Sequence, residues 1–220
     1  MSKAKNLFSY SIGKKLIMSI TGLFLISFLI VHLSGNLLLL KQDGGVAFNA
    51  YSDFMSTNPL IRVTEIILVL GFLFHIVDGL WLAKLNKDAR PVNYNVKPGN
   101  KTSSWFSRNM AVTGSIILIF LVVHLRGFLV EHRILGNPKT MYEIVQEAFE
   151  IPWYSGFYVL SMILLAFHLN HGFQSAFQSL GLNHKKYNGL ISKTGTFISI
   201  IIPLGFAIIP IYFLVKSYLN

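Results

Sequence analysis

The chain has 220 residues, of which 53% are hydrophobic and only 13% are charged. This composition is too apolar for an ordinary water-soluble domain and indicates an integral membrane protein. The absence of cysteine excludes disulfides, thiolate-held iron–sulfur clusters and covalently attached c-type haem. The formal net charge of +10 does not indicate a nucleic-acid partner, because the basic residues gather in particular loops between apolar segments.

Five apolar stretches, each about long enough to cross a bilayer as a helix, follow one another along the chain. A helix satisfies its backbone hydrogen bonds within lipid, so we predict an all-α, five-helix transmembrane bundle with residues 1–220 as a single domain. The expected helices cover about 14–40, 62–85, 106–130, 152–181 and 190–217. The first stretch is too long for a typical signal peptide, and the tail at 174–183 is expected along the membrane surface.

The loop charges predict how the chain is oriented in the membrane. Lysine and arginine outnumber the acids before the first stretch and in the second and fourth loops, whereas the first and third loops lack this excess. The positive-inside rule therefore places the N-terminus and the second and fourth loops in the cytoplasm, with the C-terminus on the far side. Simple attraction to anionic membrane lipid predicts the same orientation.

An internal repeat relates the first two predicted helices to the third and fourth. Residues 22–35 and 114–127 share the frame Gly-x9-His-Leu-x-Gly without a gap. The next helix of each half carries Phe-His-x-x-x-Gly, at residues 74–79 and 167–172. The pattern predicts a duplicated helical hairpin, with the fifth helix outside the repeat.

The repeat places four histidines inside the predicted spans: His32, His75, His124 and His168. Imidazole within a membrane is costly and is rarely kept unless it faces a cavity, a partner helix or a cofactor. Haem iron with two axial imidazoles suits electron transfer, and a bundle supplies one histidine from each of two facing helices. We therefore predict two b-type haems, with interhelical hydrogen bonding or a proton relay as the alternative.

Each of the four histidines is followed three or four residues later by a glycine on the same helix face. A porphyrin needs room beside the helix, so these glycines are expected to pack against haem: Gly35, Gly79, Gly127 and Gly172. His171 does not have this spacing and occupies the repeat position of Asp78. His171 is an alternative haem ligand. His171 and Asp78 could also bind a haem propionate or relay protons, and the alternative is that both belong to a solvated helix end.

Depth in the membrane predicts which histidines share a haem. Counted from the nearest basic boundary residue, His32 and His124 lie 17 and 16 residues deep, whereas His75 lies only 9 deep. At 1.5 Å rise per residue, the two levels are roughly 12 Å apart, a spacing that allows rapid electron transfer. The predicted pairs are His32 with His124 toward the far side, and His75 with His168 toward the cytoplasm.

At these histidines the sequence resembles the cytochrome b subunit of succinate dehydrogenase and fumarate reductase, of the b558 type with five helices and two haems. The resemblance covers nearly the whole chain and implies the same pairing of ligands. It implies two haem b groups, a flavoprotein subunit, an iron–sulfur subunit, and a quinone substrate, usually menaquinone. It also implies a bacterial cytoplasmic (inner) membrane location with a periplasmic C-terminus, a place in the respiratory chain and the tricarboxylic acid cycle, and allows a higher oligomer of the complex.

The resemblance implies electron transfer between the iron–sulfur subunit and quinone. The chain lacks a dinucleotide-binding glycine fingerprint, so no dicarboxylate catalysis is expected in it. Residues 84–108 and 184–193 would face the iron–sulfur partner. Some members carry a glutamate two residues before the fourth-span ligand for proton movement, but Ala166 stands there, which puts such a route in doubt. Arg62 and Glu65 are chosen as the quinone region, although a boundary glutamate is more often a snorkelling or capping carboxylate.

Two other functions fit parts of the pattern. A b-type subunit of a hydrogenase, formate dehydrogenase or other quinone-linked dehydrogenase would also hold haem, usually with different ligand spacing. A haem-free membrane anchor or transporter would use the repeat to line a substrate path. His132 and His184 lie in charged loops and receive no role, and Pro203 and Pro210 are expected to kink the fifth helix.

Overall fold

The computed structural model describes residues 11–88 and 109–219, and these residues form helices and short connections without a strand. The elements are α1 (Ser11–Asn36), the 3₁₀ helix η2 (Leu37–Leu40), α2 (Val46–Thr57), α3 (Pro59–Asp88), α5 (Met110–His124), the π-helix η4 (Leu125–Ile134), α6 (Met141–Glu150), α7 (Pro152–Ser179) and α8 (Asn188–Leu219). The predicted all-α class is confirmed. Residues 89–108, which include most of the second loop and the expected start of the third helix, lie outside the described residues.

Within the described residues, five helical segments are long and apolar enough to cross a membrane. They are Ile12–Leu40, Pro59–Asp88, Met110–Ile134, Pro152–Ser179 and Asn188–Leu219. Helix α3 has no buried residue, and its outward side chains, such as Ile66, Leu73 and Val77, are large, apolar and exposed. Such a surface is stable only against lipid or another apolar partner, so the protein is a multi-pass membrane protein.

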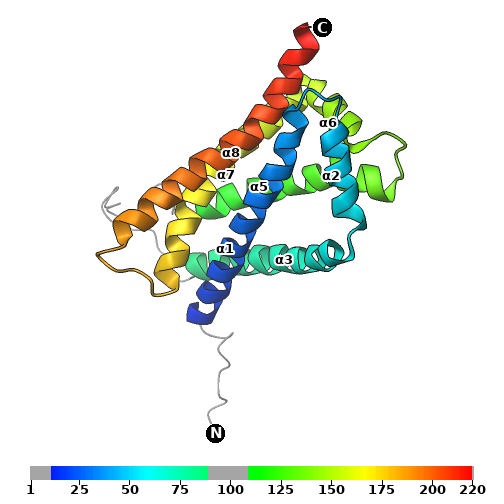
Figure 1. Ribbon diagram of the computed structural model, residues 1–220. Helices are drawn as coiled ribbons and strands as arrows, with labels where there is room; N and C mark the ends of the chain where they lie inside the picture. The colour runs from blue at the N-terminus through cyan, green and yellow to red at the C-terminus, as the bar shows by residue number, and fades with distance from the viewer. Residues whose placement is uncertain (1–10, 89–108, 220) are drawn as a thin grey trace.

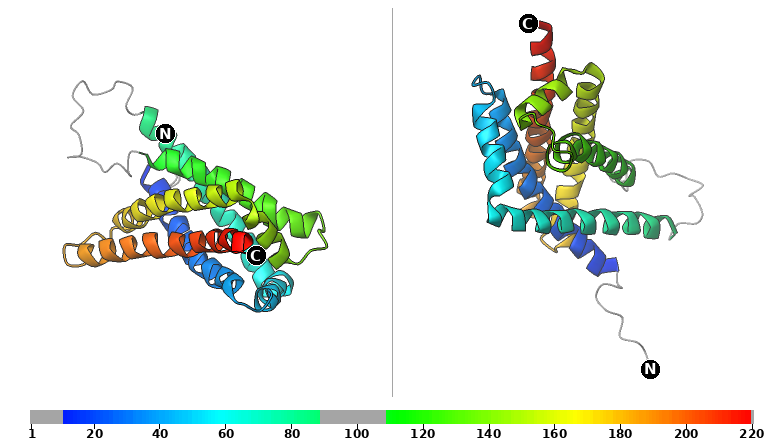
Figure 2. Two further views of the ribbon diagram at one scale, coloured as in Figure 1. Left: turned by 90° about the horizontal axis from the view of Figure 1, so that it is seen from above. Right: turned by 90° about the vertical axis from the view of Figure 1, so that its right-hand side faces the viewer.

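Four of these helices form a square, and the fifth lies against one side of it. Helix α1 packs on α3 and α7, and α5 packs on α7 and touches α3, so α1 is diagonal to α5 and α3 is diagonal to α7. Helix α8 runs antiparallel along α7, which Figures 1 and 2 show from three directions. The duplicated hairpins therefore build the square, and the helix outside the repeat covers it.

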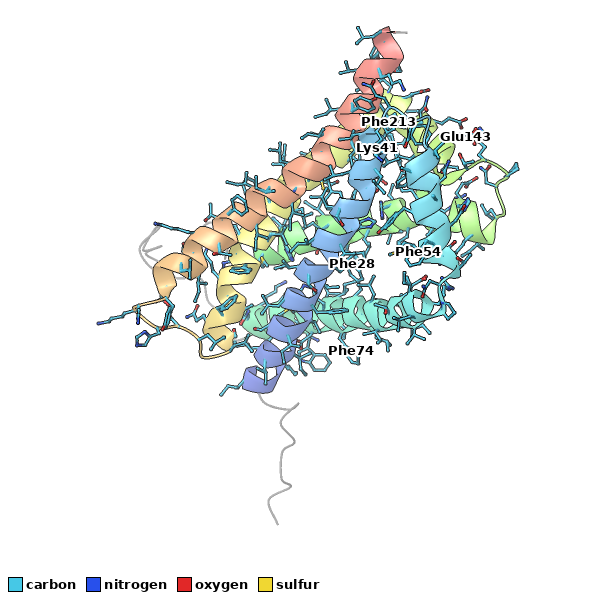
Figure 3. The ribbon with its side chains drawn as sticks, in the orientation of Figure 1. Phe28, Lys41, Phe54, Phe74, Glu143 and Phe213 are labelled. Atoms are coloured by element: carbon cyan, nitrogen blue, oxygen red, sulfur yellow. The ribbon has the colours of Figure 1, made fainter. Side chains whose placement is uncertain are left out.

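The two ends of the bundle differ in structure. The start of α1, the end of α3 and the turn between α7 and α8 lie toward the lower left of Figure 1, whereas α2, α6 and the end of α8 lie toward the upper right. At the second end, aromatic and aliphatic side chains bury one another in a core: Leu39, Phe48, Tyr142, Val145, Phe149, Tyr158, Ile209 and Phe213. Figure 3 labels Phe213 and Lys41 at this end, and Leu39 and Leu40, which precede Lys41, pack in the same core as Phe213. The short helices α2 and α6 thus cap this end of the membrane bundle.

The turn that leads into α2 requires glycine at its second position. Gly45 has φ of +88°, a conformation that L side chains rarely adopt. A Cβ added at Gly45 would also overlap the ring of Tyr142 from α6. The absence of a side chain at Gly45 therefore allows the start of α2 to lie directly against Tyr142 at the start of α6.

A capping box starts α6 and makes this cap sensitive to acid. The Thr140 side chain accepts a hydrogen bond from the Glu143 N–H, and the Glu143 carboxylate accepts from the Thr140 N–H. The Thr140 N–H and hydroxyl both donate to the Glu143 carboxylate, and these two bonds hold the pKa of Glu143 below its usual range. A lowered pKa means that the stabilisation is present above the ordinary glutamate pKa and is lost as the pH falls through the lowered value.

We expect Thr140→Ala to weaken α6 by about 1 kcal/mol, because it removes the N-cap acceptor. The protection factors of the α6 amides, which refer the exchange rate to the intrinsic rate at the same pH, should fall in Thr140→Ala at neutral pH and in the unsubstituted protein under acid conditions. Ser217→Ala, near the end of α8, is the control because it leaves α6 unchanged. Unaltered exchange in Thr140→Ala would contradict a stabilising role for the box.

Candidate functional site

The first histidine pair joins the diagonal helices α1 and α5. The rings of His32 and His124 lie edge to face, with centroids 5.9 Å apart and planes at 85°. Phe28, labelled midway along α1 in Figure 3, stacks on His32 at 5.2 Å, and Phe120 stacks on His124 at 5.7 Å. Each phenylalanine lies one turn before its histidine, so the two halves of the repeat build the same contact.

The second pair joins the other diagonal, α3 and α7. The ring centroids of His75 and His168 are 6.3 Å apart, with planes at 73°. A Cβ added at Gly22 would lie 3.3 Å from Cε1 of His75, and one added at Gly114 would lie 3.4 Å from Cε1 of His168. These two glycines open the repeated frame, and each faces the histidine of the other diagonal. Our sequence reasoning missed this role, although the shared frame carried the signal.

The spacing within both pairs fits one metal ion held between two imidazoles. A metal bound at about 2 Å by one nitrogen of each ring sets the centroids roughly 6 Å apart. In the described part of the chain, no three histidine, cysteine or acidic side chains gather into a metal-binding group. Two protein ligands per metal suit haem, because the porphyrin supplies the other four ligands of a six-coordinate iron.

The second ring nitrogen of three histidines has a polar neighbour. His75 Nδ1 lies 3.3 Å from Thr21 Oγ1, whose hydroxyl donates to the Ile17 carbonyl, so the oxygen can accept from Nδ1–H. His124 Nδ1 lies 3.3 Å from the hydroxyl of Tyr158, and His32 Nδ1 lies 3.3 Å from Asn36 Nδ2. The oxygens of Thr21 and Tyr158 can accept the Nδ1 proton of His75 and His124, which leaves Nε2 of those two rings bare to bind a metal, whereas the Asn36 amide nitrogen can only donate to His32.

His168 differs from the other three histidines. Its Nδ1 is buried and has no hydrogen-bond partner among the described residues. Thr113 occupies the repeat position of Thr21, and its hydroxyl bonds to the carbonyls of Asn109 and Met110 as that of Thr21 bonds to the carbonyls of Ile17 and Met18, but it makes no hydrogen bond to His168. The two halves are therefore alike in their histidines and glycines but not in their hydrogen bonding.

The glycines expected to pack against haem each face a neighbouring side chain in the structure. The contacts are Tyr51 at Gly35, Met18 at Gly79, Tyr154 at Gly127 and Met110 at Gly172. Met18 and Met110 occupy matching repeat positions, so the contacts at Gly79 and Gly172 are duplicated as well. A Cβ at Gly35 would overlap the Tyr51 ring, so that glycine is required by packing between α1 and α2. Haem packing at these glycines stays a prediction.

His171 and Asp78 lie near the second histidine pair, each three residues after one of its members. Both are partly buried. One carboxylate oxygen of Asp78 is buried without a hydrogen-bond partner in the described part of the chain. The Lys14 ammonium lies 4.1 Å from the centroid of Trp81 on the same helix as Asp78. No hydrogen bond between Asp78 and His171 is found, so their propionate or proton role stays a prediction.

Arg62 and Glu65 belong to a larger ionic cluster than the sequence indicated. Arg62 is ion-paired with Glu65 one turn later on α3. Arg133, at the end of η4, also binds Glu65, with Nη1 at 2.8 and 3.1 Å from the two carboxylate oxygens. We call these three residues the Arg62–Glu65–Arg133 cluster. It ties α3 to the segment that follows His124, and sequence spacing offers no signal for a pair 68 positions apart.

His132 lies at a half-open pocket of about 230 Å³ between α2 and the segment leading to α6. Its Nδ1 is buried and has no partner among the described residues. The pocket has polar and apolar lining in equal parts and is also lined by Asn49, Asp53, Asn137, Pro138, Lys139, Thr140 and Met141. His184 lies in the turn before α8, where its Nδ1 accepts from the Lys186 N–H at 3.2 Å. Neither histidine contacts the two histidine pairs.

Comparison with known proteins adds two findings. Residues 86–208 match the model of a family described as the succinate dehydrogenase/fumarate reductase transmembrane subunit. The chain is also 27% identical over 184 residues to the succinate dehydrogenase cytochrome b558 subunit of Bacillus subtilis (strain 168), covering 82% of each chain. No solved structure matches the chain. The family match includes His124 and His168, and the pairwise match extends over most of the chain.

Proposed function

Because the chain belongs to the family of succinate dehydrogenase/fumarate reductase transmembrane subunits, we propose that it is the membrane-anchoring, di-haem cytochrome b subunit of a succinate:quinone oxidoreductase. The observation that carries this proposal is the pair of histidines on each diagonal of the helix square, with ring centroids 5.9 and 6.3 Å apart. Both spacings suit an iron held between two imidazoles. The name of the Bacillus relative, a cytochrome b558 subunit, agrees with haem b.

The haem groups, when bound, supply reversible one-electron chemistry at iron. His32 with His124 would hold one group and His75 with His168 the other, each through one ring nitrogen. Phe28 and Phe120 restrict the first two rings by stacking. The capping core of α2 and α6 keeps water from the far-side pair, since residues such as Phe149 and Phe213 are buried there.

The partners in this proposal are a flavoprotein subunit and an iron–sulfur subunit. They would dock at the end of the bundle that holds the turn between α7 and α8, where Lys185 and Lys186 are exposed. This end would be cytoplasmic, with α2, α6 and the end of α8 on the far side of a bacterial inner membrane. Residues 89–108, also expected at the docking surface, lie outside the described residues.

The quinone, which we take to be menaquinone, would bind near the far-side haem at the Arg62–Glu65–Arg133 cluster. Glu65 accepts from both arginines, so in this proposal it holds the guanidinium groups rather than taking a proton. Each guanidinium has five N–H donors, and the ion pairs leave donors free for a quinone carbonyl. Arg62 and Arg133 are exposed on the surface of the structure, so a quinone could reach their free donors.

We expect Arg133→Gln to raise the quinone KM about tenfold, since a hydrogen bond to a charged group contributes about 1.5 kcal/mol. The assay would compare succinate:quinone activity with succinate:dye activity in the isolated complex. Dye reduction should not change, because it does not need the quinone site. Lys139→Gln, which breaks an ion pair with Glu147 on α6, is the matched control. An unchanged KM in Arg133→Gln would place the quinone elsewhere.

The experiment that tests the proposed function is haem quantitation. The chain would be purified with whatever co-purifies, and a dithionite-reduced minus oxidised spectrum and a pyridine haemochrome assay recorded. Two b-type haems per chain, with flavoprotein and iron–sulfur subunits in the preparation, are expected. A folded, membrane-inserted preparation without haem would overturn the proposal in favour of a haem-free anchor or transporter. Haem with a hydrogenase or formate dehydrogenase partner would favour another quinone-linked enzyme.

A further inference from the structure

The two histidine pairs differ in one respect that their shared role does not explain. His124 has a tyrosine hydroxyl 3.3 Å from Nδ1. His168, the other paired histidine of the α5–α7 hairpin, has no Nδ1 partner among the described residues. The hydroxyl belongs to Tyr158 on α7, 34 positions from His124. In the repeat, His124 corresponds to His32, whose Nδ1 lies beside the Asn36 amide nitrogen, and His168 corresponds to His75, whose Nδ1 lies beside Thr21. The phenol beside His124 therefore belongs to one half of the repeat and has no match at His32.

Tyr158 is held firmly in this position. Its side chain is 5% exposed, and its ring packs against Phe120 and Phe149 with centroids 4.9 Å away in both cases. Its hydroxyl lies 3.1 Å from that of Tyr154, one turn earlier on α7. The Tyr154 hydroxyl in turn lies against Gly127, where an added Cβ would be only 2.5 Å from it. The hydroxyls of Tyr158 and Tyr154 therefore lead from His124 Nδ1 to the backbone at Gly127.

The direction of the hydrogen bond follows from the ligand role. If Nε2 of His124 binds iron, Nδ1 carries the proton and can only donate, so the Tyr158 oxygen accepts. Tyr158 can then donate its own proton to Tyr154. Accepting a proton from a ligating imidazole makes the ring a stronger electron donor to the metal, which stabilises the oxidised iron.

We propose that Tyr158 is a positioning residue that orients His124 and lowers the reduction potential of the far-side haem relative to a site without this hydrogen bond. The proposal rests on the proposed function, because it needs haem at His32 and His124. A bare packing role for Tyr158 is the competing explanation, since its ring also belongs to the buried core. A variant that removes the hydroxyl and keeps the ring distinguishes the positioning role from the packing role.

The test is a redox titration of the isolated complex, with the two haems resolved as two components by visible spectroscopy. Tyr158→Phe keeps the ring and removes the hydroxyl, and should move one component to higher potential while leaving the other in place. Thr21→Val removes the hydroxyl beside His75 and should move the other component. Tyr142→Phe is the packing control, because Tyr142 lies in the same buried core and makes no ring contact with a histidine.

The outcomes are distinct. A rise in one component for Tyr158→Phe, absent in Tyr142→Phe, supports the proposal. Unchanged potentials in Tyr158→Phe, or equal shifts in both tyrosine variants, overturn it. If Tyr158→Phe yields no haem-loaded protein, 3,5-difluorotyrosine at position 158 keeps the hydroxyl but weakens it as an acceptor, and an unchanged potential there overturns the proposal. Absence of haem from the unsubstituted complex would instead count against the proposed function.

Discussion

Replacing any one of the four paired histidines with alanine is expected to remove one haem and to leave the other bound. His32→Ala and His124→Ala should lose the same haem, because these two rings face each other across one diagonal of the helix square. His75→Ala and His168→Ala should both lose the other haem. Haem content should therefore fall by about half in each of the four variants.

The physical reason is that an iron held by one imidazole loses half of its protein ligation. The porphyrin then depends on apolar contacts alone, and the bared ring of the remaining histidine is a costly polar group inside the membrane. The measurement is pyridine haemochrome quantitation per chain, with low-temperature difference spectra to identify which of the two haems remains.

His184→Ala is the matched control for these variants. His184 lies in the exposed turn before α8 and contacts neither pair, so both haems should stay. His171→Ala adds a sharper comparison, since His171 lies one turn from His168 and is the alternative ligand. The ligand assignment fails if His171→Ala loses a haem while His168→Ala keeps both, or if His32→Ala and His75→Ala lose the same one.

Hydrophobic runs and matched spacings predicted most of the fold. The five apolar stretches correspond to the five membrane-spanning segments of the structure, and the Gly-x9-His-Leu-x-Gly frame identified the duplicated hairpin. Depth along the helices paired the histidines, and the structure brings the same partners together. These features are local or periodic, so each is written in a short window of sequence.

The features that the sequence did not reveal depend on contacts between distant segments. The short helices α2 and α6 are less apolar than the spans and were expected only as loops. The π-helix η4 widens the helix directly after His124, and its Arg126–Glu131 pair is spaced by five residues. The contacts of Tyr158 with His124 and of Arg133 with Glu65 arise only when separate helices meet.

A bulkier side chain at position 22 is expected to damage the haem site of His75 on α3, which Gly22 faces. The haem site of His32 on α1, the helix that carries Gly22, should be spared. Gly22 lies on α1 with His32, but an added Cβ would be 3.3 Å from Cε1 of His75 on α3. Alanine there requires a shift of a few tenths of an ångström. Valine extends two further methyl groups from that point, and overpacking of this kind typically costs about 1–3 kcal/mol.

We therefore expect Gly22→Val to displace the His75 ring and to lose the haem held by His75 and His168, while the haem of His32 and His124 stays. Gly22→Ala should keep both haems with a small shift in the spectrum of one. Haem quantitation and difference spectra measure both effects. Gly156→Val is the matched control, because Gly156 also lies within a membrane helix and a Cβ added there meets nothing within 4 Å.

The result separates a specific contact from general damage to α1. If valine merely disrupted α1, the haem of His32 would be lost first or both haems would be lost together. Loss of the His75 haem alone, from a substitution on the helix of His32, can only arise if the two diagonals of the square interlock as the structure places them. The same logic applies to Gly114→Val on α5, which should affect the haem of His168 rather than that of His124.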